Sequence, residues 1–160
     1  MASQFDSWES YFYPDTIDPD TGIGTLRNLY EERDARVLSR MEYTDTTVRA
    51  VQLGNGEVEI PRTFDGAHLC AIHGHLFQDV YEWAGEYRTV EMSKGPGRGF
   101  GEVRSGEVDR YLSDARQLVT STDWAKISRN DFIATASTVF AYVNTGGSAL
   151  FDRELSVPRE

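Results

Sequence analysis

Apolar residues recur at every third or fourth position through most of this chain, and this spacing constrains the fold more than any other feature. A recurrence of this kind places the apolar side chains on one face of an α-helix. It predicts helices over residues 25–53, with a break near 44–47 at which the stretch could divide in two, and over 65–80, 106–119 and 131–142. The last of these is apolar on most sides, which predicts a central, buried helix. We therefore expect a mostly α-helical fold.

One segment departs from the helical pattern. Residues 89–92 alternate like a strand, residues 93–99 are rich in glycine and proline, and residues 100–103 are again extended in character. A strand, a Gly/Pro tip and a second extended piece predict a β-hairpin. Residues 8–23 combine aromatic and turn-forming residues, and predict an ordered arm without regular structure.

Charge and cysteine content limit the function classes. Asp and Glu number 26 against 16 Lys and Arg, for a net charge of −10 in 160 residues. A phosphate backbone would repel such a surface, so we expect no nucleic-acid binding. The single cysteine, Cys70, excludes an intrachain disulfide and fits a reducing cytoplasm. No apolar run approaches the roughly 20 residues that span a bilayer, and residues 1–8 lack signal-peptide features, so we expect a cytoplasmic protein that does not bind membranes.

The densest motif lies at residues 72–90, which read IHGHLFQDVYEWAGEYRTV. This run resembles the Fic/Doc (Fido) family, whose members have the pattern IHxxLFxDVYxWAGxxR in this region. In the family the pattern extends from the end of a helix into a flap hairpin. A weaker similarity includes Tyr13-Pro14 and the opening of the stretch at 25–28. The resemblance covers about residues 11–144 and implies a Fic-like helical domain with one β-hairpin flap.

In this family the flap holds the target protein as an added strand. The resemblance therefore makes the flap a candidate docking site, with these residues: Arg88, Thr89, Val90, Glu91, Met92, Ser93, Lys94, Gly95 and Phe100. Most members transfer AMP from ATP to a hydroxyl side chain of a target protein, with Mg²⁺ on the phosphates. Many carry an inhibitory helix with the pattern (S/T)xxxE(G/N), which is absent from this sequence. The implied partners are thus a protein target and a separate antitoxin-like inhibitor.

The catalytic motif of the family, HPFx(D/E)GNGRxxR, does not occur in this sequence. In the family its His acts as general base, its acidic residue holds Mg²⁺, and its Gly-Asn-Gly and Arg residues bind phosphate. Aligned on residues 142–144, the His position falls on Gly147, the acidic position on Phe151 and the following Arg on Leu155. We assign no catalytic residue, and we expect no competent ATP or Mg²⁺ site here.

The expectation is therefore a single truncated domain over residues 1–160, with an unmatched tail at 145–160 and without the later helices of the family. A degenerate, inactive domain is the leading hypothesis. The alternatives are a protein- or peptide-binding module that uses the flap, a toxin-like partner of an antitoxin, and a structural remnant. A frameshift or an artificial junction near Asn144 would also produce the change in composition, and translating the other reading frames would reveal it.

A metal site at His68, Cys70, His73 and His75 is the other candidate that these residues suggest. On a helix, His68 and His75 share a face while the other two point elsewhere, so four ligands do not converge. We therefore predict no metal, and a structural role for His73.

Three further features have simpler interpretations. The loop at 94–99 lacks the Gly-Lys-Ser/Thr of a P-loop. Tyr81 and Trp83 are expected in the core rather than as a stacking platform. Glu82 and Glu86 are expected as a solvated pair rather than an acid/base couple.

Overall fold

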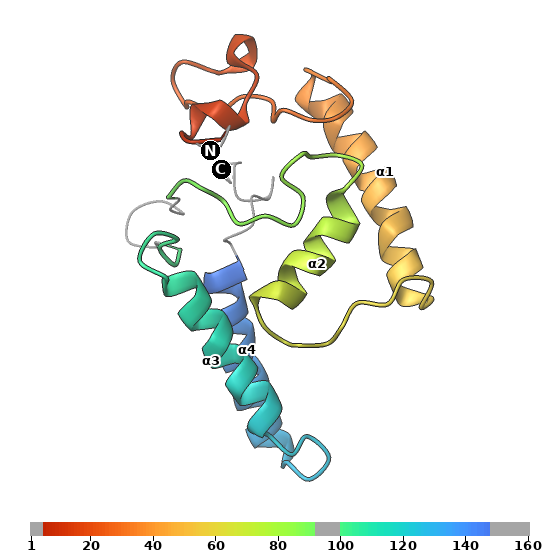
Figure 1. Ribbon diagram of the computed structural model, residues 1–160, viewed down its shortest axis with the longest axis vertical. Coiled ribbons are helices and arrows are strands. Elements are labelled where there is room, and N and C mark those ends of the chain that lie inside the picture. Colours follow the sequence, from red (N-terminus) through yellow and green to blue (C-terminus); the bar gives the residue numbers. More distant parts are fainter. Residues whose placement is uncertain (1–4, 92–99, 148–160) are drawn as a thin grey trace. The chain divides into compact units, whose positions relative to one another are not determined.

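The computed structural model describes residues 5–91 and 100–147, and its regular elements within these ranges are helices (Figure 1). The α-helices are α1 (Ala35–Gly54), α2 (Gly66–Phe77), α3 (Glu107–Ser121) and α4 (Arg129–Gly147). Two short 3₁₀ turns, Glu9–Tyr11 and Pro14–Thr16, lie in the N-terminal arm. No helix in the described ranges is long and apolar enough to cross a membrane. The mostly α-helical prediction is confirmed.

The chain divides into two compact units. The first unit consists of Met1–Ile60 and Cys70–Val90, and the second of Pro61–Leu69 and Glu91–Glu160.

The first unit is built around the aromatic arm. Its buried side chains come mainly from the arm, from α1 and from the segment that follows α2: Phe5, Tyr11, Phe12, Tyr13, Leu26, Leu38, Val80, Tyr81 and Trp83. An isolated antiparallel bridge joins Phe12 to Leu26. The predicted order of the arm is confirmed, because burying this much aromatic surface offsets the entropy of ordering it. The expectation that the arm has no regular structure is wrong at the two short 3₁₀ turns.

Helix α1 begins ten residues later than the periodicity predicted. The backbone of residues 25–34 is engaged elsewhere: Thr25 O accepts from Tyr13 N–H (2.9 Å), Arg27 N–H donates to Tyr11 O (2.8 Å), and Leu29 N–H donates to Val80 O (2.8 Å). These long-range bonds use the groups that a helix would need. The helix begins instead at Ala35 and is capped by Asp34, whose carboxylate accepts from the N–H groups of Arg36 (2.7 Å) and Val37 (3.1 Å). The same bonds lower the pKa of Asp34 below its ordinary value.

The predicted division of this stretch near 44–47 is also wrong. Helix α1 is continuous over Ala35–Gly54, and its threonine hydroxyls donate to carbonyls of the preceding turn. Thr44 donates to Arg40 O at 2.8 Å and Thr47 to Tyr43 O at 2.6 Å.

A polar stripe fastens α1 to the rest of the first unit. The hydroxyl of Tyr81 donates to Glu42 and that of Tyr30 to Asp45, both at 2.5 Å. One turn further, Arg49 makes a two-pronged ion pair with Asp79, at 2.7 and 3.0 Å. The Arg49 guanidinium lowers the pKa of the Asp79 carboxyl, while burial raises the pKa of Tyr30 above its ordinary value.

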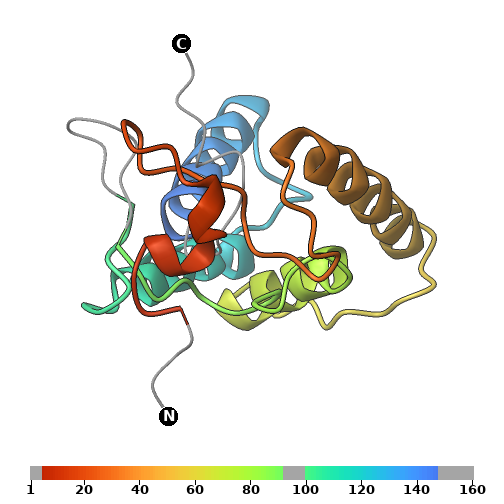
Figure 2. The same cartoon turned by 90° about the horizontal axis from the view of Figure 1, so that it is seen from above.

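In the second unit, α3 and α4 form an antiparallel helical hairpin, and they lie side by side in both views (Figures 1 and 2). Helix α3 buries Val108, Leu112 and Ala115. Gly146 of α4 allows close approach, because a Cβ there would lie 3.1 Å from the Leu112 side chain. The prediction that α4 is buried on most sides is wrong: Phe132, Ile133 and Phe140 are exposed. One side of α4 packs against α3, and the side that carries these three residues is exposed.

Candidate functional site

The segment from α2 into the predicted flap is held by a hydrogen bond between His73 and Gly85. His73 is buried on α2, and its Nδ1 accepts from the Gly85 N–H at 2.9 Å. An Nδ1 that accepts a hydrogen bond carries no proton, so this geometry places the proton of a neutral imidazole on Nε2. The contact fits the structural role predicted for His73.

Gly85 is required at this position by its backbone conformation and by its neighbours. Its φ is +85°, a region that residues with a Cβ rarely adopt. A Cβ at Gly85 would lie 3.0 Å from Cys70 O and 3.1 Å from the Cα of Gly74. Helix α2 and the following turn therefore meet backbone to backbone, which accounts for glycine at position 85. A Cβ at Gly74 would make only ordinary van der Waals contacts, the nearest at 3.5 Å.

Trp83 is the centre of an aromatic cluster that joins this turn to the arm. Its ring stacks on Tyr81 at 4.8 Å between centroids and makes edge contacts with Phe5 (4.9 Å) and Tyr11 (5.2 Å). The predicted core role of Tyr81 and Trp83 is confirmed. Glu82 lies between them in sequence but is exposed, as is Glu86, in agreement with a solvated pair.

The base of the predicted flap, residues 88–90, is anchored to the arm by Tyr11. The Tyr11 hydroxyl accepts from the Thr89 N–H at 3.2 Å and lies 3.0 Å from Thr89 Oγ1. Thr89 Oγ1 in turn donates to the backbone oxygen of Phe5. The buried guanidinium of Arg88 donates to Val90 O at 2.5 Å. These bonds fix the point at which the flap leaves the first unit.

The β-hairpin itself is not seen in the described residues. Residues 88–91 and 100–103 form no strand, while Met92, Ser93, Lys94 and Gly95 lie outside the described residues. Side chains take backbone groups that a strand ladder would use: the Glu91 carboxylate accepts from the N–H groups of Val103 and Arg104, both at 3.4 Å.

The predicted docking residues differ in how accessible they are. Arg88 and Val90 are buried and Thr89 is half-buried, so these three act as anchors of the flap base. Glu91 is exposed and Phe100 is half-buried. The sequence analysis missed Tyr11 and Phe5 as part of this site. The density of aromatic residues in the arm was the signal that pointed to their burial, but not to their contact with Thr89.

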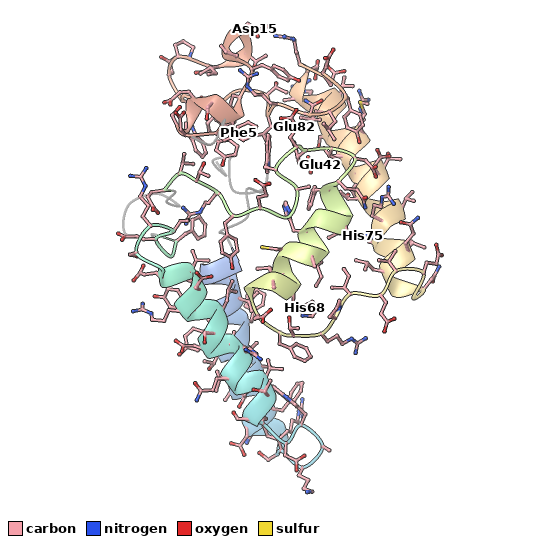
Figure 3. The ribbon with its side chains drawn as sticks, in the orientation of Figure 1. Phe5, Asp15, Glu42, His68, His75 and Glu82 are labelled. Carbon is pink, nitrogen blue, oxygen red and sulfur yellow. The ribbon has the colours of Figure 1, made fainter. Side chains whose placement is uncertain are left out.

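The histidines of α2 each have a different contact and do not form a common site. His75 Nε2 lies 3.1 Å from Arg49 O, and His68 Nδ1 accepts from the Phe64 N–H at 3.3 Å. Figure 3 shows His68 and His75 toward opposite ends of the helix. Over residues 5–91 and 100–147, no group of three or more His, Cys, Asp or Glu side chains is placed to hold a metal ion.

We expect the Tyr11→Phe substitution to release the flap base. It removes the acceptor of the Thr89 N–H in a partly buried setting, which costs about 1 kcal/mol in stability. Amide exchange of Thr89, followed by NMR, should accelerate by at least tenfold. Tyr13→Phe is the matched control, because the Tyr13 hydroxyl donates to Asn28 O (3.2 Å) in the same arm. Equal acceleration of Thr89 exchange in both variants would contradict the anchoring role of Tyr11.

Curated relatives of this chain carry adenylyltransferase names. It is 33% identical over 99 residues to "Probable protein adenylyltransferase Fic" of Salmonella typhimurium, covering 61% of this chain and 44% of the relative. It is 32% identical over 127 residues to "Probable protein adenylyltransferase y4lH" of Sinorhizobium fredii, covering 77% and 61%. The chain thus spans less than two thirds of the length of these relatives. No protein-family model matches it.

Solved structures share the fold. The N-terminal Fic domain of a VirB-translocated Bep effector from Bartonella quintana superposes with a TM-score of 0.63 at 25% identity, over 86% of this chain and 64% of that one. A Fic domain from the same organism with bound ADP gives a TM-score of 0.63 at 23% identity, over 91% and 72%. The second likeness concerns the fold alone.

Proposed function

The chain belongs to the Fic family, and from this premise we propose that it is the target-docking part of a Fic-type domain and does not itself transfer AMP. The observation that carries the proposal is the stretch after Tyr142-Val143-Asn144. It reads TGGSALFDREL, where the family places its catalytic motif.

The residues at the motif positions do not fit ATP and Mg²⁺. Gly147 has no side chain to accept a proton from a target hydroxyl. Phe151 offers no oxygen to a magnesium ion, and Leu155 offers no charge to a phosphate. The bound ADP of the Bartonella quintana domain supports nucleotide binding in that relative. For this chain we propose no catalytic step through a nucleotide or a metal.

The anchored flap base supports the docking role. A segment that adds as a strand gains main-chain hydrogen bonds, and its affinity improves when the receiving edge is held in place beforehand. Tyr11, Thr89 and Arg88 hold the start of the flap through the bonds described above. The proposed ligand is therefore an extended segment of a target protein.

We expect no AMP transfer from this chain. Purified protein would be incubated with labelled ATP, Mg²⁺ and a cell extract, beside an active Fic adenylyltransferase as the positive control. Intact-mass measurement would detect an AMP adduct on the chain itself. Robust labelling of the chain or of an extract protein would overturn the proposed inactivity, since the motif position would then have a functional substitute.

Docking is tested separately by pull-down with the wild-type chain and two variants. A target that binds the flap should be captured by the wild type and by Tyr13→Phe, and captured much less by Tyr11→Phe. Calorimetry with the purified target would give the affinity. Failure of the wild type to retain any protein, or equal retention by both variants, would count against flap docking.

The antitoxin alternative has its own signature in the same experiment. The sequence lacks the (S/T)xxxE(G/N) pattern of the inhibitory helix, so an inhibitor would have to be a separate protein. A captured protein that carries this pattern, and that binds all three forms equally, would favour the toxin–antitoxin interpretation.

A further inference from the structure

Two dipeptides of this chain have residues whose side chain and backbone can react with each other. Asn55-Gly56 follows α1, and Asp65-Gly66 lies at the start of α2. When Asn or Asp precedes glycine, the glycine nitrogen can attack the side-chain carbonyl carbon, because no Cβ hinders its approach. The ring closes only after the backbone rotates to bring this nitrogen to the side chain. The folded structure therefore decides which of the two sites reacts.

The structure restrains Asp65. Its Oδ1 accepts hydrogen bonds from the Thr63 hydroxyl at 2.6 Å and from the His68 N–H at 3.1 Å. These bonds lower the pKa of the Asp65 carboxyl and keep it ionised, and a carboxylate is a poor electrophile. The Asp65 carbonyl also accepts from the Leu69 N–H at 3.1 Å. Attack by the Gly66 nitrogen would thus require the first turn of α2 to unwind.

Asn55 is held less firmly. It is exposed and caps the C-terminal end of α1, and helix ends are the parts of a helix that open most readily. Its side-chain amide donates to the exposed Glu57 at 3.3 Å. Rotation after Asn55 breaks two end bonds, from Gly56 N–H to Leu53 O (3.2 Å) and from Glu57 N–H to Gln52 O (3.0 Å). The rest of α1 stays intact during this opening.

We propose that Asn55 is a site of spontaneous deamidation in the folded chain. The Gly56 nitrogen forms a bond to Asn55 Cγ, the C–N bond of the side-chain amide breaks, and ammonia leaves with the proton from the Gly56 nitrogen. Water then opens the resulting succinimide ring at either carbonyl, which gives aspartate or isoaspartate. The overall reaction consumes one water and releases one ammonia.

The reaction changes the C-terminal end of α1 in two ways. A carboxylate at this end of a helix opposes the helix dipole, and here it also lies beside Glu57. Isoaspartate in addition inserts the side-chain methylene into the main chain. The affected turn contains Arg49 at its start, which ties α1 to Asp79 and to His75. We therefore expect the amides of this turn to exchange faster in the deamidated chain.

Peptide mapping of the folded chain tests the site. The protein would be incubated at mildly alkaline pH and digested, and the Asn, Asp and isoaspartate peptides would be separated by chromatography. We expect conversion at Asn55 at least about tenfold faster than at Asn130 and Asn144, which are also exposed but precede residues with a Cβ. Gly56→Ala should slow the reaction by a similar factor, since its Cβ hinders the attack.

The same measurement in guanidinium chloride tests the role of the fold. Unfolding removes the hydrogen bonds that hold Asp65, so isoaspartate formation at Asp65 should accelerate at least about tenfold, and by a larger factor than at Asn55. Absence of conversion at Asn55 in the folded chain, a rate no higher than at Asn130, or an unchanged rate in Gly56→Ala would overturn the proposal. Equal acceleration of Asn55 and Asp65 on unfolding would overturn the selection of Asn55 by the structure.

Discussion

Gly85→Ala is expected to lower the free energy of unfolding of the first unit by about 2–4 kcal/mol. Two effects add. The φ of +85° places any residue with a Cβ in a left-handed region that costs about 1–2 kcal/mol. The new Cβ also meets the backbone at 3.0 Å (Cys70 O) and 3.1 Å (Gly74 Cα), and neither atom moves without shifting α2. The substitution should also weaken the Gly85 N–H bond to His73.

Gly56→Ala separates these two effects. Gly56 has a similar φ of +72°, but a Cβ there would have no heavy atom within 4 Å. Only the conformational cost remains, so we expect a loss of about 1 kcal/mol. Urea unfolding followed by circular dichroism would compare the two variants. Equal losses at both positions would show that the approach of α2 to the turn is looser than described.

Trp83→Ala is expected to cost about 3–5 kcal/mol, the range for removing a large aromatic side chain from a core. Trp83 is only 4% exposed and contacts the rings of Phe5, Tyr11 and Tyr81. A loss of this size is a large fraction of the 5–15 kcal/mol typical of a domain. The variant should therefore have a frayed arm and a mobile flap base, since Tyr11 would lose the ring against which it packs.

Trp124→Ala is the control for this substitution. Trp124 is 36% exposed, contacts Phe132 edge-on at 5.7 Å between centroids, and donates its indole N–H to Val119 O. Its removal should cost about 1 kcal/mol or less. Denaturation midpoints and the exchange rate of the Thr89 amide would report the two effects. A loss at Trp124 as large as at Trp83 would contradict the central place of the Trp83 cluster.

The spacing of apolar residues predicted the helices well where those residues form one face of the helix. The stretches at 65–80, 106–119 and 131–142 correspond to α2, α3 and α4 within a few residues. Each has apolar residues at helical spacing and no strong competitor for its backbone groups. The same reasoning placed Trp83 and Tyr81 in the core, because leaving such rings in water is costly.

The predictions that failed concern groups whose partners are distant in sequence. Residues 25–34 have helical spacing, yet their backbone bonds to Tyr13, Tyr11 and Val80 prevent a helix. The alternation at 89–92 favours a strand, but residues 89–91 form none and Thr89 is held by Tyr11, 78 positions earlier, while residue 92 lies outside the described residues. The apolar composition of α4 predicted a buried helix, but the burial of a helix depends on which elements pack against it.

The sequence by itself determined the helical architecture, the family, and the absence of the catalytic motif from residues 145–160, because these depend on residue type and spacing alone. Only the tertiary structure decided how the flap base is anchored, why Gly85 must be glycine, and which side of α4 is open. These depend on contacts between residues far apart in the chain, and a local pattern contains no information about which distant groups will meet.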